Sequence, residues 1–269
     1  GNDLPALSLT QVQGKIEILS SSFDNILFPS LTTIDDDLKI ERTKLDSLNF
    51  ESLTSIQNIL FGPYNGYNSQ EGDGSYFALN TFNSLVSMGN LKIENNTGAP
   101  WSANNSGLHH IGGFSNLQIC GLLEVDDNHL LTSCCKLLDL SAAASSITIN
   151  NNGTNCGSLL ATASVCGTSF CGTSNYTTVI TQQSEVDALA GCTSFLGSLR
   201  IEGSNINNVD SLVNLTTIED DLIIQSIPAN GNDLPALSLT QVQGKIEILS
   251  SSFDNILFPS LTTIDDDLK

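Results

Sequence analysis

A short apolar phrase recurs along the chain and constrains the possible folds more than any other feature of the sequence. It reads Leu-Thr-x-Ile and then, three residues later, Leu-x-Ile, as in residues 31–40, and it returns in variant form at residues 53–61, 85–93 and 215–224. Two apolar positions that lie two residues apart form the inward face of a short strand. The predicted strand cores start at positions 16, 38, 59, 91, 123, 147, 179, 199, 222 and 246.

The step from one strand core to the next is mostly a little over twenty positions, which is typical of the coils of a leucine-rich-repeat or β-helical solenoid. In such a fold each strand pairs in parallel with strands of the adjacent coils, because one coil cannot bury its own apolar face. A β-sandwich of short strands is the alternative, but its turn signals would recur every 8–12 residues or so, about half the spacing seen here. We therefore predict an all-β chain folded as a parallel single-stranded β-helix or leucine-rich-repeat-like solenoid.

A second, longer repeat encloses the first. Residues 1–39 and residues 231–269 have the same sequence, so the chain also has a 230-residue period that runs from Gly1 to Gly231. Two old copies would have diverged, which indicates that the duplication is recent or is kept uniform. We interpret the chain as a window on a tandem array of nearly identical units in a much longer parent protein.

The short phrase resembles the receptor L domain, a leucine-rich-repeat-like β-helix of insulin-receptor and epidermal-growth-factor-receptor ectodomains, and more closely its relatives in large secreted bacterial surface proteins. The segment 183–192 followed by Leu199-Arg200-Ile201 resembles the entry of that family, which is a short helix, a cysteine and the first strand. Ser133-Cys134-Cys135 with Asn155-Cys156 resembles its exit. The resemblance implies a solenoid with a short helix and disulfide-fastened caps, but not receptor signalling, since the cysteine-rich modules and the kinase of the animal receptors are missing.

Domain boundaries follow from these caps. The entry near residues 183–191 begins a domain, and the stretch 150–175, rich in Asn, Gly, Ser, Thr and Cys, ends one. We therefore expect residues 1–166 to be a solenoid domain without its start, residues 167–175 to be an inter-repeat boundary, and residues 176–269 to be the start of the next identical domain.

The seven cysteines cluster between residues 120 and 192, which suggests that they fasten the solenoid ends. A zinc site is the alternative, but C-x₂-C pairs with a nearby histidine are missing, so disulfides in an oxidising compartment fit better. We expect Cys171 to pair with Cys192 around the entry helix. The exit cysteines follow successive strands and should lie one coil apart, within disulfide reach. For them we predict the pairs Cys135–Cys156 and Cys134–Cys166, with Cys120 left as a buried thiol.

Two acidic runs, Asp35-Asp36-Asp37 and Glu219-Asp220-Asp221, stand where the L-domain pattern usually has a glycine before the strand. They fall at the same position of their coils, two coils apart once the 230-residue offset is applied. Stacked acidic loops could hold Ca²⁺, which takes six to eight oxygen ligands or so. The alternative is a solvated acidic face that keeps the protein soluble and suppresses pairing at sheet edges.

Two long insertions carry most of the exposed aromatic chemistry of the chain. Residues 62–81 and 95–108 are insertions of about ten residues after neighbouring strands, so they should protrude side by side. They carry three of the four tyrosines of the chain and its only tryptophan: Tyr64, Tyr67, Tyr76 and Trp101. Aromatic rings on Gly-, Asn- and Ser-rich loops are contact chemistry. A lid folded over one flank of the solenoid is the alternative.

Composition excludes several functions. The net charge of −20, from 9 basic and 29 acidic residues, argues against binding nucleic acid or inserting into an anionic membrane surface. The histidines, His109, His110 and His129, form no recognisable catalytic spacing, so we expect no enzyme. The leading hypothesis is a repeat unit of a long secreted cell-surface filament or adhesin that contacts itself, a target cell or a glycan. A ligand-binding receptor ectodomain is the alternative, and a β-helix carbohydrate-active enzyme the third.

Overall fold

The computed structural model describes residues 3–21, 23, 25–41, 45, 47–62, 76–79, 81–94, 107–228, 237–253 and 255–269. The chain divides into two compact units, residues 1–158 and 159–269. Both units are built mainly from short parallel strands, so the predicted parallel β-solenoid is confirmed.

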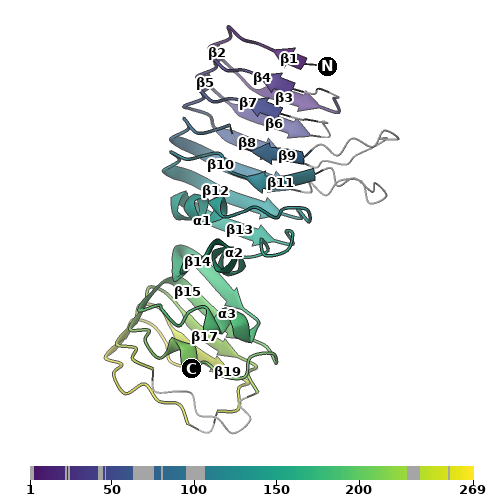
Figure 1. Ribbon diagram of the computed structural model, residues 1–269. Coiled ribbons are helices and arrows are strands. Elements are labelled where there is room, and N and C mark those ends of the chain that lie inside the picture. The colour runs from purple at the N-terminus through teal and green to yellow at the C-terminus, as the bar shows by residue number, and fades with distance from the viewer. Residues whose placement is uncertain are drawn as a thin grey trace. The chain divides into compact units, whose positions relative to one another are not determined.

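In the first unit, successive coils contribute strands to parallel sheets that run along the unit (Figure 1). The largest sheet has the strand order β13-β12-β10-β8-β6-β3, and smaller sheets have the orders β1-β4-β7, β2-β5 and β11-β9. The elements are β1 (Asp3–Pro5), β2 (Gln11–Val12), β3 (Ile16–Leu19), β4 (Asn25–Leu27), β5 (Thr33–Ile34), β6 (Asp37–Glu41), β7 (Ser47–Asn49), β8 (Asn58–Phe61), β9 (Tyr76–Leu79), β10 (Ser87–Glu94), β11 (Gly107–Ile111), β12 (Ile119–Asp126), α1 (Lys136–Ala143) and β13 (Ala144–Asn150).

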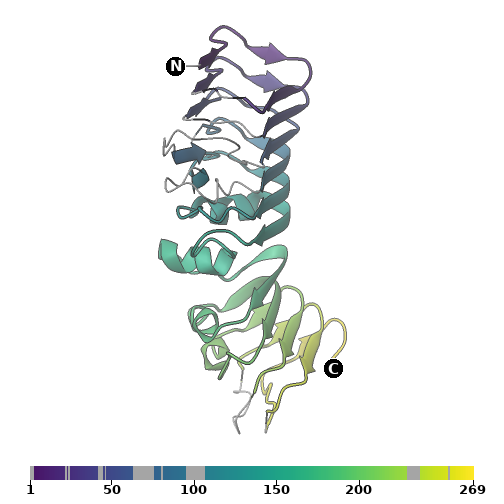
Figure 2. The same cartoon turned by 90° about the vertical axis from the view of Figure 1, so that its right-hand side faces the viewer.

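The strands of the largest sheet lie one above another in successive coils (Figure 2), and their register places equivalent apolar positions opposite one another. One column of facing residues consists of Ile16, Leu38, Ile59, Leu91, Leu123 and Ile147. These are the strand cores that the short phrase predicts. Most of these side chains are buried, and Leu38, Leu91 and Leu123 are fully so. The apolar column therefore forms the core only when coils stack.

A file of phenylalanine rings forms a second column in the first unit. Phe28, Phe50, Phe82 and Phe114 stand in successive coils, and the ring centroids of neighbours lie 5.2, 5.6 and 5.1 Å apart. The rings are stacked with interplanar angles of 18–21°. Offset stacking at this separation adds to the free energy gained by burying the rings.

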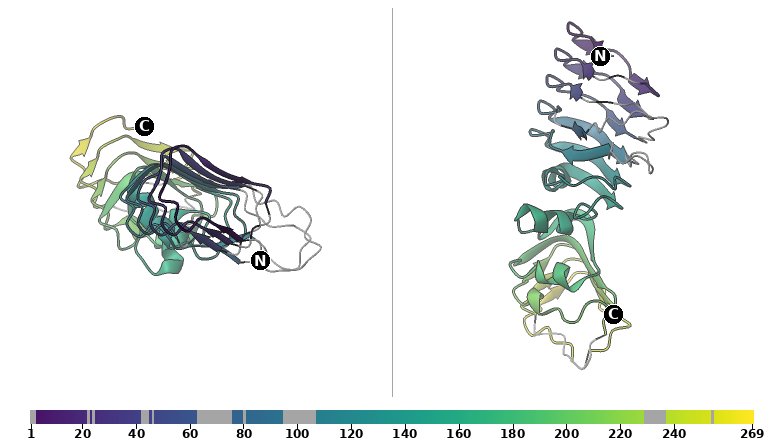
Figure 3. Two further views of the ribbon diagram at one scale, coloured as in Figure 1. Left: turned by 90° about the horizontal axis from the view of Figure 1, so that it is seen from above. Right: turned by 45° about the vertical axis from the view of Figure 1, so that its right-hand side comes forward.

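The second unit has the same construction, with the strand order β19-β17-β15-β16-β18-β20 and with β14 paired to β15 (Figure 3). Its elements are α2 (Leu159–Cys166), β14 (Gly172–Ile180), α3 (Gln183–Asp187), β15 (Ser194–Glu202), the 3₁₀ helix η1 (Asp210–Leu212), β16 (Thr217–Ile218), β17 (Leu222–Gln225), β18 (Gln241–Val242), β19 (Ile246–Leu249) and β20 (Thr263–Ile264). Helix α3 is the short helix expected at residues 183–191. It begins with a capping box, in which Glu185 accepts hydrogen bonds from the backbone of Thr181 and Gln182.

One predicted strand core is wrong by a single residue. The sequence placed Val179 on the inward face, but Val179 is 42% exposed, whereas Thr178 and Ile180 are buried. Thr178 is the residue that faces Leu199 of the next coil. The ladder between β14 and β15 shifts register between Gly172 and Thr177, and such an irregularity changes which residues point inward.

Candidate functional site

The first acidic run is built into a ladder of hydrogen bonds between coils. Asp37 Oδ1 accepts a hydrogen bond from Asn58 Nδ2 at 2.7 Å, and Asn58 Oδ1 accepts one from Asn90 Nδ2 at 2.7 Å. Asn90 Oδ1 in turn accepts a hydrogen bond from the backbone N–H of Leu122 at 3.0 Å. The carboxylate of Asp37 therefore begins a polar file that continues over the next three coils.

The second acidic run makes comparable contacts. Glu219 accepts hydrogen bonds from the backbone N–H of Gly197 at 2.8 Å and from Ser174 Oγ at 2.9 Å. Asp220 accepts one from Ser198 Oγ at 2.8 Å, and the Lys245 N–H donates to Asp221 at 2.9 Å. These carboxylates accept hydrogen bonds from neighbouring coils, and these bonds help to stack one coil on the next.

The register keeps the acidic runs of the second unit apart. Ile218 faces Val242, and Val242 faces Ile264, so the residues after them, Glu219 and Asp265, are two coils apart. Parallel strands are spaced about 4.8 Å apart, which puts about 10 Å between the backbones of these two runs. A calcium ion needs its oxygen ligands at about 2.3–2.6 Å. Within the part of the chain that the structure describes, no group of three or more His, Cys, Asp or Glu residues could hold a metal ion.

The outward face of the long strands carries ion pairs that the sequence analysis missed. Lys39 lies 3.0 Å from Glu41, and Lys92 lies 3.1 Å from Glu94 and 3.2 Å from Glu124 of the next coil. The hydrogen bond with Glu94 raises the pKa of Lys92. The signal was a basic residue, Ile and Glu in succession, which recurs at residues 15–17, 39–41, 92–94, 200–202 and 245–247.

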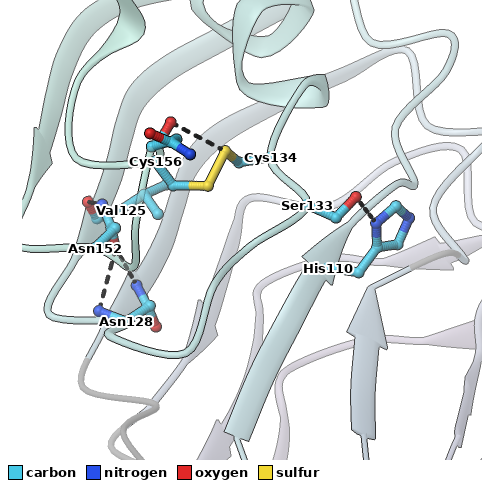
Figure 4. Close-up of a disulfide and its surroundings, with 8 residues drawn as sticks. His110, Val125, Asn128, Ser133, Cys134, Asn152 and Cys156 are labelled. Carbon is cyan, nitrogen blue, oxygen red and sulfur yellow. Dashed lines mark hydrogen bonds between the residues drawn. A yellow bond between two sulfur atoms is a disulfide. The ribbon is translucent and has the colours of Figure 1, made fainter. Parts of the chain in front are cut away.

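The exit cysteines pair differently from the prediction. Cys134 is joined to Cys156, with 5.9 Å between the Cα atoms (Figure 4), so the predicted pairs Cys135–Cys156 and Cys134–Cys166 are both wrong. Cys134 is buried, whereas the adjacent Cys135 is the exposed N-cap residue of α1. Neighbouring residues point in different directions, and the start of α1 decides which of the two faces the coil of Cys156. Cys135 and Cys166 are also disulfide-bonded.

The entry cysteines lie as the sequence predicts. Cys171 is joined to Cys192, with 5.6 Å between the Cα atoms, and this disulfide encloses α3. Cys120 is the free thiol of the chain and is buried. Disulfides of this number indicate folding in an oxidising environment.

Two asparagines and a histidine link the last coils of the first unit (Figure 4). Asn128 is fully buried and donates to the Ile93 carbonyl at 2.9 Å, while Asn152 donates to the Val125 carbonyl at 2.8 Å. His110 Nδ1 lies 2.6 Å from Ser133 Oγ of the next coil. The His110–Ser133 contact joins neighbouring coils, as the asparagine contacts do.

The roots of the two predicted contact loops lie together. Strand β8 pairs with β10, and β9 pairs with β11, so each insertion leaves and re-enters the solenoid beside the other. Gly62, with φ +133°, follows β8 and touches the backbone carbonyl of Glu94, where β10 ends. Any Cβ at position 62 would overlap that carbonyl, so glycine is required there.

The aromatic residues of these loops fall mostly outside the described residues. Tyr64, Tyr67 and Trp101 are among the residues that the structure does not describe, and Tyr76 is placed only through its backbone, as the first residue of β9.

No protein-family model, no curated protein and no solved structure matches this chain. No helix among the described residues combines the length and the hydropathy needed to cross a membrane. The class that the fold itself defines is a parallel β-solenoid with disulfides.

Proposed function

We propose that this chain is a repeat unit of a long, secreted cell-surface filament or adhesin of the kind found among bacterial L-domain-like surface proteins. Its role is to be a modular stalk that presents contact loops at regular intervals, either to a target cell or glycan or to a second copy of the same chain. In this proposal it carries out no catalysis and needs no cofactor, and removal of calcium with a chelator tests the acidic runs.

The observation that carries this proposal is the repeated segment. Residues 1–39 and 231–269 share one sequence, and β2, β3 and β5 of the first copy recur as β18, β19 and β20 of the second. A solenoid grows by adding coils at its edges without changing those already present. A sequence that repeats in register with the coils is therefore suited to an array of great length.

The disulfides and the surface charge support a location outside the cell. The net charge of −20 makes copies of the chain repel one another, which helps to prevent their open strand edges from aggregating. Regular repetition also raises avidity, because each further site binds at a high effective concentration once the first has bound. A weak contact at each unit is therefore sufficient for attachment.

A series of proteins with one, two and three 230-residue periods tests the stalk. About nine coils at about 4.8 Å each predict that every added period lengthens the particle by about 43 Å. Small-angle scattering or electron microscopy measures that increment. Particles that widen instead of lengthening as periods are added would contradict the proposal.

A ligand-binding receptor ectodomain is the second candidate, supported by the same L-domain-like phrase. It differs in requiring one binding event per molecule rather than one per period. Binding stoichiometry measured on the same series separates the two, because a stalk with repeated contact loops gains one site with every period.

A further inference from the structure

The repeated segment folds in the same way in two different surroundings. The pairing of β2 with β5 recurs one full period later in the pairing of β18 with β20, with the same register. Ser20 and Ser250 share the unusual positive φ of 51°. Thr32 Oγ1 donates to the Thr10 carbonyl at 2.9 Å, and Thr262 repeats the contact with Thr240 at 2.9 Å. The parts of the two copies that contain β2, β3 and β5 therefore fold alike, whichever coils flank them.

The first copy buries one edge of the segment. Its Ile26 and Leu38 are fully buried, because the next coil supplies Leu48 and Ile59 opposite them. In the second copy the same two positions are Ile256 and Leu268, which are 48% and 63% exposed. The difference arises from the covering coil, which pairs with β4 and β6 in the first copy.

The second copy buries the opposite edge. Leu237 and Leu239 are fully buried there, against the coils that contain β16 and β17. In the first copy these positions are Leu7 and Leu9, which are 61% and 37% exposed. Each copy thus buries the apolar residues that the other leaves open.

We infer that the apolar edge formed by residues 255–269 is an interaction surface whose partner is the coil sequence of residues 40–61 in another copy of this chain, joined directly after Lys269. The complete unit then consists of residues 167–269 followed by residues 40–166, so that the disulfide-bonded residues Cys135 and Cys166 stay in the same half. The first copy already shows this partner seated on this edge, because β4 and β6 there pair with β7 and β8, which lie within residues 40–61. The inference depends only on the structure of the repeated segment, and holds whether or not the array is a stalk.

The complete unit has a continuous core and closed ends. Its long strands run in the order β14, β15, β17, then the shared strand that is both β19 and β3, then β6, β8, β10, β12 and β13. The disulfide Cys171–Cys192 lies near its first strand and Cys134–Cys156 near its last. Both open apolar edges of the present chain become interior, and the ends of the unit are the disulfide-bearing segments.

A rearranged protein tests the inference, in which residues 167–269 are followed directly by residues 40–166 and every disulfide-bonded cysteine is kept. We expect a monomer that unfolds in one cooperative transition, with a Tm above that of the 269-residue chain. Amide hydrogen exchange at residues 263–269 should slow by at least about tenfold relative to the same residues in the 269-residue chain, because a coil now covers them. Failure to fold, or two separate unfolding transitions, would contradict the inference.

Matched substitutions make the test specific to the edge. In the 269-residue chain, Leu38→Asp should lower the Tm of its unit by more than about 8 °C, whereas Leu268→Asp should change it little. In the rearranged protein, Leu268→Asp should be as damaging as Leu38→Asp is in the original. Gln243→Ser, at a position exposed in both copies, is the control and should be neutral in both proteins. A neutral Leu268→Asp in the rearranged protein would overturn the inference even if that protein folds.

Discussion

At the scale of single residues, the chain keeps one thiol out of its disulfides by burying it. Cys120 is 1% exposed, and its Sγ lies 3.4 Å from the Leu122 carbonyl, to which it donates a hydrogen bond. Burial raises the pKa of Cys120 to about 11. The thiolate is the reactive form of cysteine, so the folded protein protects this residue from oxidation and exchange.

We predict that Cys120 reacts with a thiol reagent at pH 8 only after the protein unfolds. We expect the reagent to label one thiol per chain in guanidinium chloride and none in the native protein. A Cys120→Ala variant should have no reactive thiol in either state. Because an unfolded thiol titrates near pH 8.5 while the folded one stays protonated to about 11, its contribution to stability is present below pH 8.5 and is lost as the pH rises through that interval. Fast labelling of the native protein would refute this account.

The phenylalanine file is the other residue-scale feature with a measurable effect. Phe50 is fully buried and stacks on both Phe28 and Phe82. We predict that Phe50→Ala lowers the free energy of unfolding of the first unit by about 3–5 kcal/mol, the usual cost of a large cavity. Urea denaturation followed by circular dichroism measures it. Phe258→Ala, at the half-buried equivalent of Phe28 in the second copy, is the matched control and should cost clearly less.

At the scale of elements, the strands and the entry cap were predictable, whereas the disulfide pairing of the exit cap was not. The strand cores follow from apolar residues two apart, since that spacing is fixed by the geometry of any strand. The column of phenylalanine rings could also be predicted from the sequence, although it was not predicted above. Each of Phe28, Phe50, Phe82 and Phe114 is followed three residues later by Leu. Helices α1 and α2 carry no comparable period, because each is only eight residues long.

The choice between Cys134 and Cys135 shows where sequence spacing stops being informative. Both residues stand at nearly the same distance from Cys156 along the chain, so spacing favours neither. The choice depends on the backbone direction where α1 begins, and that direction is set by tertiary packing. The prediction that Val179 faces inward was wrong for a related reason, because one register shift in β14 exchanged the inward and outward faces of the strand.

The acidic runs are elements of the coil corners, and their hydrogen bonds predict how they respond to a chelator. The donors already held by Asp37, Glu219, Asp220 and Asp221 come from the protein itself. We therefore predict that excess EGTA changes the Tm by less than about 2 °C, measured by calorimetry with a magnesium-matched control. A fall of more than about 8 °C, on the order of 2–4 kcal/mol for a chain of this size, would favour a calcium site.

At the scale of the whole molecule, the two insertions are the features that distinguish one side of the solenoid from the others. Their roots are adjacent at Gly62 and Glu94, so in the proposed tandem array the loops would recur as a pair once in every 230-residue period. We predict that replacing Tyr64, Tyr67 and Trp101 with Ser leaves circular dichroism and Tm nearly unchanged while reducing adhesion or chain association. Binding of protein-coated beads to target cells measures adhesion, and sedimentation measures chain association. Unfolding of the triple variant would show that these rings form a lid and belong to the core.

The orientation of the hydrogen bonds between coils determines how each unit responds to tension. In a parallel solenoid these bonds run along the axis, so a pull along that axis loads the bonds of one coil at a time and not all of them together. Each coil that peels away releases a chain of about 21–32 residues, about 70–110 Å when extended. The Cys134–Cys156 and Cys171–Cys192 bonds stop this release within the segments that they enclose. A chain of this kind, if pulled at its two ends, would therefore be expected to lengthen in small steps, one coil at a time.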